Sequence, residues 1–402
     1  MNKIVIVGAG QAAGWAVHTL RGQGFTGEIH VVSNEEQVFY ERPPLSKKVL
    51  AKQIGIESLN LFSADQMDAF SIIWHKPDVA VDVDKTNKNV HLQSGKILAY
   101  DKLLLATGSR ARMPVSTWLN IPHVYTLRDI QDCQQLAEKL QSAQRIAVIG
   151  GGWIGLEIAV TARQQGKQVE IFEYGTRLCA RSVSPEVSDF LKHLHEDAGT
   201  RIHLNATALH LIATAEQRVE VLNAPHIVQT FDCVVVGAGA EIAKELATQA
   251  TLTVKDGIVV NTFGQTSDEH IYAAGDVAIH PQLGYCIQSW ANAQNQAIAV
   301  AKSMLGEMTA YEDIPWLWSD QYDCNIQILG VYQPEKTQKI VIRQTTHHQV
   351  SFFYLDDQHR LLNMIAVNDA KVVKLAKRWM MSARELNFAE LQDPEFNVMK
   401  LK

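Results

Sequence analysis

Two glycine-rich segments carry the residue pattern best suited to chemistry in this chain. Gly8-Ala9-Gly10-Gln11-Ala12-Ala13 follows the apolar run Ile4–Val7, and Gly150-Gly151-Gly152-Trp153-Ile154-Gly155 follows Arg145–Ile149. Glycines at these positions permit a tight turn and let a pyrophosphate approach backbone N–H groups at the positive end of the following helix. The two segments therefore predict two dinucleotide-binding sites in one chain.

Carboxylates follow each glycine segment where a second strand should end. Asn34 and Glu35 follow the first, and Glu35 is the better carboxylate for the adenosine ribose, although Asn34 could also hydrogen-bond it. The alternative is that this glutamate is a solvated turn residue. Glu173 follows the second, where it would accept bonds from the 2′-OH of NADH and repel a 2′-phosphate. Arg177 and Arg181 lie just beyond and could soften this preference for NADH over NADPH.

Strands and helices that would position these residues can be read from the apolar spacing. Each glycine segment lies between a short β-branched run and a stretch with helical periodicity, and a second apolar run completes a βαβ unit of about thirty residues. The expected elements are the strands Ile4–Val7, Ile29–Val32, Arg145–Ile149 and Gln168–Phe172 and the helices Gln11–Leu20 and Ile154–Gln165. The predicted fold class is α/β, with two Rossmann-like dinucleotide-binding domains.

The predicted domain organisation follows from two further strands and a change of pattern. Lys102–Ala106 precedes Thr107-Gly108, and Cys233–Val236 precedes Gly237-Ala238-Gly239, as if the chain left one domain and returned to it. From about Ile314 the sequence turns to tryptophans and alternating strands such as Gln338–Arg343 and Val350–Leu355. We therefore predict a first domain from 1–108 and 232–313, a second from 109–231, and a third α+β domain from 314–402.

Composition and charge exclude several classes of function. The net charge of −6 argues against a nucleic-acid binder, and no run of about twenty apolar residues predicts a membrane span. The start of the chain lacks the pattern of a secretion signal, so we expect a cytoplasmic protein. The histidines, including the pairs His193/His195 and His347/His348, follow no metal-binding spacing, so we predict no metal site. We expect these histidines to lie at the surface or to be hydrogen-bonded in the core.

The cysteines exclude a dithiol redox centre. The chain has five, widely separated, and no two form a C-x-x-C pair or a zinc-type spacing. We expect them to be buried, reduced thiols that act as small apolar residues. A disulfide reductase of the glutathione or thioredoxin type, which also carries two dinucleotide fingerprints, needs such a dithiol and is therefore excluded.

Two more motifs give the pattern a family resemblance. Ile271-Tyr272-Ala273-Ala274-Gly275-Asp276 resembles the second FAD motif of the two-dinucleotide flavoprotein superfamily, which has the glutathione-reductase type of fold. Leu105-Ala106-Thr107-Gly108 resembles its companion motif between the domains. Hydride transfer between a nicotinamide and a flavin is the chemistry that two facing dinucleotides serve, so the cofactors expected are FAD and NADH.

Finer motifs resemble one branch of that superfamily across essentially the whole chain. They are Tyr40-Glu41-Arg42-Pro43-Pro44-Leu45-Ser46-Lys47, Trp153-Ile154-Gly155-Leu156-Glu157 and Pro315-Trp316-Leu317-Trp318-Ser319-Asp320-Gln321-Tyr322. They resemble the ferredoxin reductase components of bacterial aromatic-ring-hydroxylating dioxygenases, especially the phenylpropionate type. The resemblance extends to putidaredoxin reductases and, less closely, to apoptosis-inducing factor.

The resemblance implies roles for single residues of this chain. Glu157 would hold the nicotinamide carboxamide and could pair with Lys47 across the two cofactors. The residues expected to contact FAD, besides those of its fingerprint and ribose site, are Arg42, Lys47, Val79, Thr107, Gly108, Arg128, Gly275, Asp276 and Trp290. A departure from the family pattern, Gly237-Ala238-Gly239-Ala240-Glu241-Ile242 in place of a turn ending in Pro-Asn, puts the contact of Gly239 with the nicotinamide end in doubt.

Two C-terminal features could serve an electron acceptor. Trp316 and Trp318 are expected on opposite faces of a strand, with one near the flavin and the other inside; alternatively both are core aromatics. A basic stripe on the C-terminal helix could steer an acidic ferredoxin, although a solvated helix face has the same pattern. Its residues are Lys371, Lys374, Lys377, Arg378 and Arg384.

The predicted function is electron transfer from NADH through FAD to a [2Fe–2S] ferredoxin of the Rieske type in a multicomponent oxygenase. No protein nucleophile or general acid is needed, because the cofactor supplies the chemistry. One alternative is a reductase for a cytochrome P450-linked ferredoxin. Another is an NADH-sensing flavoprotein like apoptosis-inducing factor, although the sequence lacks a targeting segment. The sequence leaves open whether the protein is a monomer or a homodimer.

Overall fold

The computed structural model describes residues 1–223, 227–346 and 349–401. The chain forms two compact units, each built from three separate segments. Unit 1 comprises Met1–Arg42, Ile56–Arg110 and Ala240–Pro315, and unit 2 comprises Pro43–Gly55, Ala111–Gly239 and Trp316–Lys402. His347 and His348, one of the histidine pairs considered in the sequence, lie outside the described residues.

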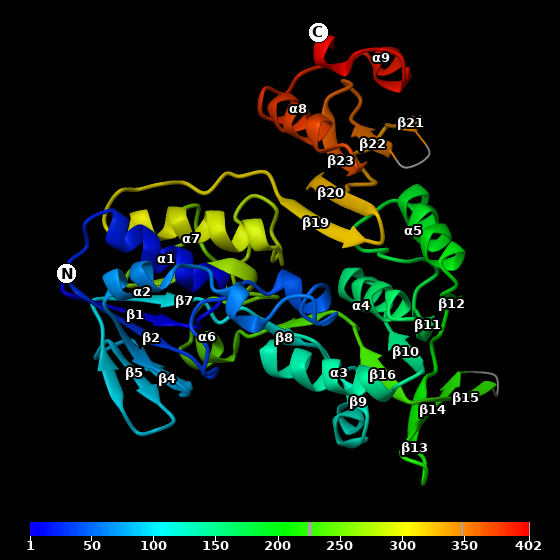
Figure 1. Cartoon of the computed structure of the whole chain (residues 1–402). Coiled ribbons are helices and arrows are strands. Elements are labelled where there is room, and N and C mark those ends of the chain that lie inside the picture. The colour runs from blue at the N-terminus through cyan, green and yellow to red at the C-terminus, as the bar shows by residue number, and fades with distance from the viewer. Residues whose placement is uncertain (224–226, 347–348, 402) are drawn as a thin grey trace. The chain divides into compact units, whose positions relative to one another are not determined.

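Unit 1 is centred on a five-stranded parallel sheet with the strand order β18-β7-β1-β2-β3. These strands are β1 (Lys3–Val7), β2 (Glu28–Val32), β3 (Ile72–His75), β7 (Lys102–Leu105) and β18 (Ile271–Ala273). The helices α1 (Gln11–Gly22) and α7 (Trp290–Met304) lie side by side and share one apolar core with the sheet (Figure 1). The first predicted βαβ unit is thus confirmed.

A second group of elements in unit 1 packs on the other face of the parallel sheet. The antiparallel strands β4 (Ala80–Asp84), β5 (Asn89–Leu92) and β6 (Ile97–Ala99) form a three-stranded sheet. Their buried side chains join those of the short helix α6 (Glu245–Gln249) in a second apolar cluster. The smaller elements are α2 (Ala64–Phe70), η2 (Ile56–Leu59), η4 (Gly275–Val277) and the paired strands β8 (Ser109–Ala111) and β17 (Ala240–Ile242).

Unit 2 contains the second parallel sheet, with the order β12-β11-β10-β16-β9. Its strands are β9 (Val124–Tyr125), β10 (Arg145–Ile149), β11 (Gln168–Phe172), β12 (Arg201–His203) and β16 (Cys233–Val236). The helix α4 (Trp153–Gln164) connects β10 to β11, which confirms the second predicted βαβ unit. Also in this unit are α3 (Ile130–Ser142), α5 (Pro185–Asp197), η1 (Pro43–Ser46), η3 (Ser116–Asn120) and the antiparallel strands β13 (His210–Ala213), β14 (Val219–Asn223) and β15 (Ile227–Phe231).

The strand β16 differs from its expected place. We expected the chain to be back in the first domain from residue 232, but β16 pairs in parallel with β10, with Cys233 opposite Ile146. All four of its residues are buried, as in any central strand of a parallel sheet, so its apolar run carries no information about which of the two sheets it joins. The predicted three-domain boundaries remain a prediction.

The C-terminal segment of unit 2 is an antiparallel sheet covered by helices. The order β19-β20-β23-β22-β21 is formed by β19 (Trp316–Gln321), β20 (Cys324–Gly330), β21 (Lys339–Thr346), β22 (Gln349–Leu355) and β23 (Leu361–Val367). The helix α8 (Ala370–Met381) packs on β20 and β23, and α9 (Phe388–Gln392) and η5 (Val398–Lys400) follow. The α+β character expected here is confirmed. Within the described residues, no helix combines the length and apolar character needed to cross a bilayer.

Candidate functional site: two nucleotide cradles and a buried ion pair

The first cradle, in unit 1, lies where β1 turns into α1. Gly8 has φ +112, and a Cβ there would lie 2.2 Å from the carbonyl oxygen of Ala106, so only glycine fits. Gly10 is the N-cap of α1, and a Cβ at this position would meet no protein atom within 4 Å. The space at the helix N-terminus is therefore open to a ligand, and the backbone N–H groups there suit a pyrophosphate.

The second FAD-type motif lies against this same helix. Gly275 has φ +82, and its backbone N–H donates to Gln296 Oε1 at 2.8 Å. A Cβ on Gly275 would lie 3.0 Å from Cβ of Ala12, which with Ala13 is buried in the first turn of α1. The next residue, Asp276, accepts a hydrogen bond of 2.7 Å from Ser109 Oγ. The structure thus brings together two predicted motifs separated by more than 250 positions.

Glu35 is held by two neighbours instead of being a free turn residue. Its carboxylate accepts from Tyr40 OH and from Arg42 Nη2, both at 2.6 Å. The Arg42 guanidinium also lies over the Tyr40 ring, 4.9 Å from its centroid. The alternative of a merely solvated glutamate is therefore wrong, and a fixed carboxylate at the end of β2 remains available to a ribose, because a carboxylate has about four acceptor positions.

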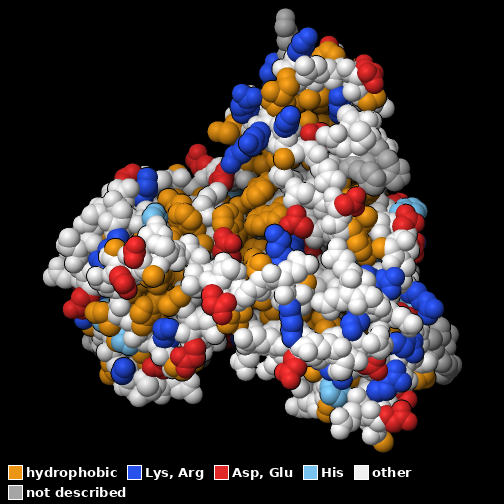
Figure 2. Space-filling model, in the orientation of Figure 1, with side chains coloured by type: hydrophobic (Ala, Val, Ile, Leu, Met, Phe, Trp, Pro, Cys, Tyr) orange, Lys and Arg blue, Asp and Glu red, His pale blue; other side chains and the backbone are white. Residues whose placement is uncertain are grey.

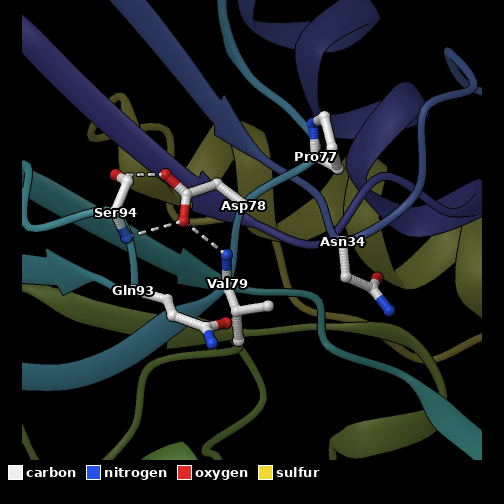
Figure 3. A pocket seen from close by; sticks show the side chains of 6 residues that line it. All are labelled: Asn34, Pro77, Asp78, Val79, Gln93 and Ser94. Carbon is white, nitrogen blue, oxygen red and sulfur yellow. Dashed lines mark hydrogen bonds between the residues drawn. The ribbon is translucent and has the colours of Figure 1, made fainter.

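A pocket of ≈ 360 Å³ opens near the end of β2, and its lining includes Asn34 and Val79 (Figure 3). Asp78 fixes the pocket wall by accepting from Val79 N at 2.8 Å and from Ser94 Oγ at 2.6 Å. Ser33 and Asp78 are joined through their backbones, which ties the wall to the end of β2. Asn34 and Val79, predicted independently as FAD contacts, therefore share one hollow of a size suited to part of a nucleotide.

Other residues predicted to contact FAD fall into both units. Thr107 donates its hydroxyl to the Ala243 carbonyl at 2.7 Å, and Gly108 has φ +66, so this companion motif shapes a turn in unit 1. Trp290 is the first residue of α7, also in unit 1, and is half-buried. Lys47, Arg128 and Trp318 belong to unit 2.

The second cradle, in unit 2, repeats the geometry of the first. Gly150 has φ +107 and no room for a Cβ, which would lie 2.4 Å from the Gly237 carbonyl oxygen. A Cβ on Gly155 would lie 2.2 Å from the Gly150 carbonyl oxygen, so this glycine permits close packing of α4 on the strand. Gly152, the N-cap of α4, again has open space, and Ile154 in the first turn is 45% exposed.

Glu173 closes the second cradle at the end of β11. Its two carboxylate oxygens accept from the backbone N–H groups of Gly151 and Gly175, each at 2.6 Å. The guanidinium of Arg177 is committed to backbone carbonyls and to Ser188 Oγ. Arg181 instead lies beside Gly239, whose Cβ would be 2.9 Å from its Nη2. Of the two arginines considered from the sequence, Arg181 is thus the one at the rim of the cradle.

A buried ion pair joins Lys47 to Glu157 within unit 2. The Lys47 Nζ lies 3.1 Å from Glu157 Oε1, and Glu157 is 6% exposed. Ser319 Oγ also donates to Oε1 at 2.6 Å, and Ser46 Oγ donates to Oε2. The predicted pair is present, whereas the two serine donors were missed, because Ser319 is 162 positions away in the sequence and gives no local signal.

The expectation that the two tryptophans of β19 lie on opposite faces was wrong. The rings of Trp316 and Trp318 stack with centroids 5.2 Å apart and an interplanar angle of 21°. Side chains alternate along a strand, so residues two apart share a face instead of occupying opposite faces. Both rings are half-buried, and the Lys47 ammonium lies 5.8 Å from the Trp318 ring centroid.

All five cysteines are free, and four of them are buried. Burial raises the pKa of the Cys133 thiol to about 11 and that of Cys286 to about 12. These thiols stay protonated near neutral pH, which is the state of an inert structural cysteine. Among the described residues, no three histidine, cysteine or acidic side chains gather as metal ligands.

Four residues of the basic stripe, Lys371, Lys374, Lys377 and Arg378, lie on α8, but Arg384 lies beyond the end of the helix at Met381, contrary to expectation. Lys371, Lys374 and Arg378 are exposed, whereas Val372, Val373, Leu375 and Ala376 are buried against the sheet. Figure 2 shows blue side chains gathered over this helix. The apolar face explains why the helix packs, and the basic face remains for a partner or for solvent.

Comparison with known proteins agrees with the two cradles. A family model described as pyridine nucleotide-disulphide oxidoreductase matches residues 2–297, and one described as reductase C-terminal matches residues 316–402. The chain belongs to the pyridine nucleotide-disulphide oxidoreductase family. Members of this family use FAD and NADH, so the predicted cofactors and the predicted resemblance are confirmed.

Relatives and solved structures cover nearly the whole chain. The ferredoxin–NAD(+) reductase component of the p-cumate 2,3-dioxygenase system of Pseudomonas putida is 33% identical over 98% of this chain and 97% of its own. Rhodocoxin reductase of Rhodococcus erythropolis is 33% identical over 98% and 93%. The structure of a covalent putidaredoxin reductase–putidaredoxin complex matches with a TM-score of 0.92 and 33% identity, over 98% of this chain and 96% of that chain.

Proposed function

We propose that this chain is an FAD-dependent NADH:ferredoxin oxidoreductase that supplies a [2Fe–2S] ferredoxin, of the Rieske type, in an aromatic-ring-hydroxylating dioxygenase system. The observation that carries the proposal is a pair of complete nucleotide cradles in one chain whose five cysteines are free and form no dithiol. Relatives named as ferredoxin–NAD(+) reductase components, such as that of the p-cumate system, support the choice of acceptor.

The first cradle fits FAD. The N-terminus of α1 would hold the pyrophosphate, the carboxylate of Glu35 and the amide of Asn34 the adenosine ribose, and Asp276 the ribityl region. Ser109 fixes Asp276 by donating a hydrogen bond of 2.7 Å, so this carboxylate is oriented before a ligand arrives. When bound, FAD accepts a hydride from NADH and passes the electrons on singly, which is the chemistry that the protein itself lacks.

The second cradle fits NADH. The carboxylate of Glu173 is fixed by two backbone N–H groups, and in this place it would accept from the 2′-OH and repel a 2′-phosphate. Glu157 would accept from the carboxamide of the nicotinamide. Lys47 would stabilise negative charge on the reduced cofactor, and its pairing with Glu157 holds both side chains in place.

The exposed basic face of α8 is the proposed docking surface for the ferredoxin. Lys371, Lys374 and Arg378 would attract an acidic partner from solution. Similarity to the ferredoxin reductase for the CYP199A2 system from Rhodopseudomonas palustris, with 32% identity and a TM-score of 0.92, favours a second candidate, in which the ferredoxin serves a cytochrome P450 with the same reductase chemistry. We place the protein in the cytoplasm, where a reducing environment suits five free thiols.

An anaerobic titration tests the proposal. The purified protein should be yellow with bound FAD, be bleached by about one equivalent of NADH, and be reoxidised by a Rieske-type [2Fe–2S] ferredoxin at many turnovers per second. A P450-type ferredoxin and ferricyanide serve as comparison acceptors. Faster turnover with the P450-type ferredoxin would favour the second candidate.

Two other outcomes would contradict the proposal. Reduction by NADH that leaves a long-lived charge-transfer complex, accompanied by dimerisation and slow transfer to every ferredoxin, would indicate a sensor instead of a reductase. A colourless protein that cannot be reconstituted with FAD would show that the chain does not bind the flavin.

A further inference from the structure

A buried chain of polar side chains ends on Glu157. Gln321 Nε2 lies 3.1 Å from Ser319 Oγ, and His195 Nε2 lies 2.9 Å from Gln321 Oε1. His195, Gln321 and Ser319 are all 0% exposed. All four side chains belong to unit 2 and come from α5, β19 and α4, so the chain links three elements through its core.

The carboxylate fixes the direction of every bond in this chain. An ionised Glu157 can only accept, so the single hydroxyl proton of Ser319 must point to it. Ser319 must then accept from the amide nitrogen of Gln321, which leaves the amide oxygen facing His195. His195 must therefore carry its proton on Nε2.

The surroundings of His195 agree with this tautomer. Its Nδ1 is buried and makes no hydrogen bond within the described part of the chain, so a proton there would be buried without an acceptor. Burial also lowers the pKa of His195, which favours the neutral ring. The donors thus all point in one direction: His195 donates to Gln321, Gln321 to Ser319, and Ser319 to Glu157.

We propose that His195, Gln321 and Ser319 are positioning residues that orient the Glu157 carboxylate so that one acceptor position stays directed to the carboxamide of the nicotinamide. Ser46, Ser319 and Lys47 occupy three of the roughly four acceptor positions of this carboxylate. The remaining position would accept the carboxamide NH2. This inference rests on the proposed function, because it requires NADH in the second cradle.

Two nucleotides that differ only near the carboxamide test the proposed hydrogen bond from the carboxamide NH2 to Glu157. NAD+ has the carboxamide NH2, and its 3-acetylpyridine analogue lacks it but is otherwise closely similar. Calorimetry on the FAD-loaded protein should give about tenfold tighter binding of NAD+, the value of one hydrogen bond to a charged group. The variants Ser319→Ala and Gln321→Met should reduce this preference to less than about threefold, and combining them should add little, because both interrupt the same chain.

Ser184→Ala is the matched control. Ser184 is also 0% exposed in unit 2 and also hydrogen-bonds a buried side chain, Tyr354 OH at 2.7 Å, and among the described residues its side chain has no hydrogen bond to His195, Gln321, Ser319 or Glu157. Its variant should lose similar stability and keep the full preference for NAD+. A general weakening of the unit would lower the affinity for both nucleotides and leave their ratio unchanged.

NMR of the protein with 15N-labelled histidine gives a second measurement, which needs no nicotinamide ligand. The signal that disappears in His195→Phe should report protonation at Nε2 only. An Nδ1–H tautomer, or a preference for NAD+ equal in the wild type, Ser319→Ala and Ser184→Ala, would overturn the inference and leave the proposed function intact. Failure of the wild type to bind NAD+ or NADH at all would instead overturn the proposed function.

Discussion

Among single residues, Glu157 is a buried carboxylate paired with Lys47. It is 6% exposed and lies 3.1 Å from Lys47, so removing its charge leaves an ammonium group without its counter-ion in a partly buried site. We expect Glu157→Gln to lower the free energy of unfolding by about 3 kcal/mol. The same variant should slow reduction of the bound flavin by NADH at least tenfold, as measured by anaerobic stopped flow.

Glu170→Gln is the control for this variant. Glu170 is 4% exposed, lies in the middle of β11, and is held by Arg145, Arg201 and His203. The loss of stability should be comparable, but the rate of flavin reduction should stay near the wild-type value. Equal slowing in both variants would show that the effect of Glu157→Gln is only structural.

Glu173 should decide the choice between the two nicotinamide cofactors. Glu173→Ala removes the carboxylate that would repel a 2′-phosphate and leaves Arg181 at the rim of the cradle. We expect the ratio of kcat/KM for NADH to that for NADPH to fall at least tenfold. Adding Arg181→Ala should lower kcat/KM for NADPH again, and an unchanged ratio in the single variant would contradict this role for Glu173.

Whether a site residue could be predicted depended on how far it lies in the sequence from its partners. The glycines, the carboxylates proposed to bind ribose and Lys47 belong to compact motifs, so the sequence alone marked them as site candidates. Ser319 and Gln321 share the strand β19, but His195 comes from α5 and Glu157 from α4, so these hydrogen bonds exist only once the three elements have packed in the same unit. No periodicity within one segment marks such a chain.

At the scale of elements, the first turn of α1 offers a direct test of the FAD cradle. A Cβ on Gly10 meets no protein atom within 4 Å, and the φ of −86 suits alanine, so Gly10→Ala should fold normally. Its methyl group would occupy the space expected for the pyrophosphate. We predict an apoprotein melting temperature within a few degrees of the wild type and FAD binding at least tenfold weaker, measured by flavin fluorescence.

Gly22→Ala supplies the comparison within the same helix. Gly22 is the last residue of α1, and a Cβ there also meets no protein atom within 4 Å. This variant should bind FAD as the wild type does and gain up to about 1 kcal/mol of stability, because alanine is the better helix former. Unchanged FAD affinity in Gly10→Ala would place the pyrophosphate elsewhere.

The elements themselves were largely predictable, and the exceptions have physical reasons. Both βαβ units show their strand and helix periodicities within about thirty residues, so the pattern alone identified them. The sheet membership of β16 was not predictable, because a strand buried on both faces has the same apolar run in either sheet. The stacking of Trp316 on Trp318 was predictable, because side chains alternate along a strand and residues two apart share a face. The expectation of opposite faces applied this rule wrongly.

At the scale of the whole molecule, the distribution of charge should control the encounter with ferredoxin. The chain has a net charge of −6, yet α8 exposes Lys371, Lys374 and Arg378 on one face. Lys371→Glu with Lys374→Glu should lower kcat/KM for an acidic ferredoxin about tenfold or more and weaken its dependence on salt. The rate with ferricyanide should not change.

Reversal of two exposed lysines in unit 1 is the control for that experiment. Lys96→Glu with Lys255→Glu changes the net charge by the same amount, but on unit 1, whereas α8 belongs to unit 2. If both pairs lowered kcat/KM equally, the overall charge and not the α8 face would determine the encounter.

Hydride transfer requires that FAD held by the first cradle and NAD(H) held by the second react with each other in one protein. A crystal structure of the protein with both FAD and NAD+ bound is the decisive measurement. We expect the nicotinamide and isoalloxazine rings to be in contact there, with the reacting carbon and nitrogen about 3–3.5 Å apart and the carboxamide at Glu157. Rings separated by more than one side chain, in crystals of both the oxidised and the reduced protein, would contradict this expectation.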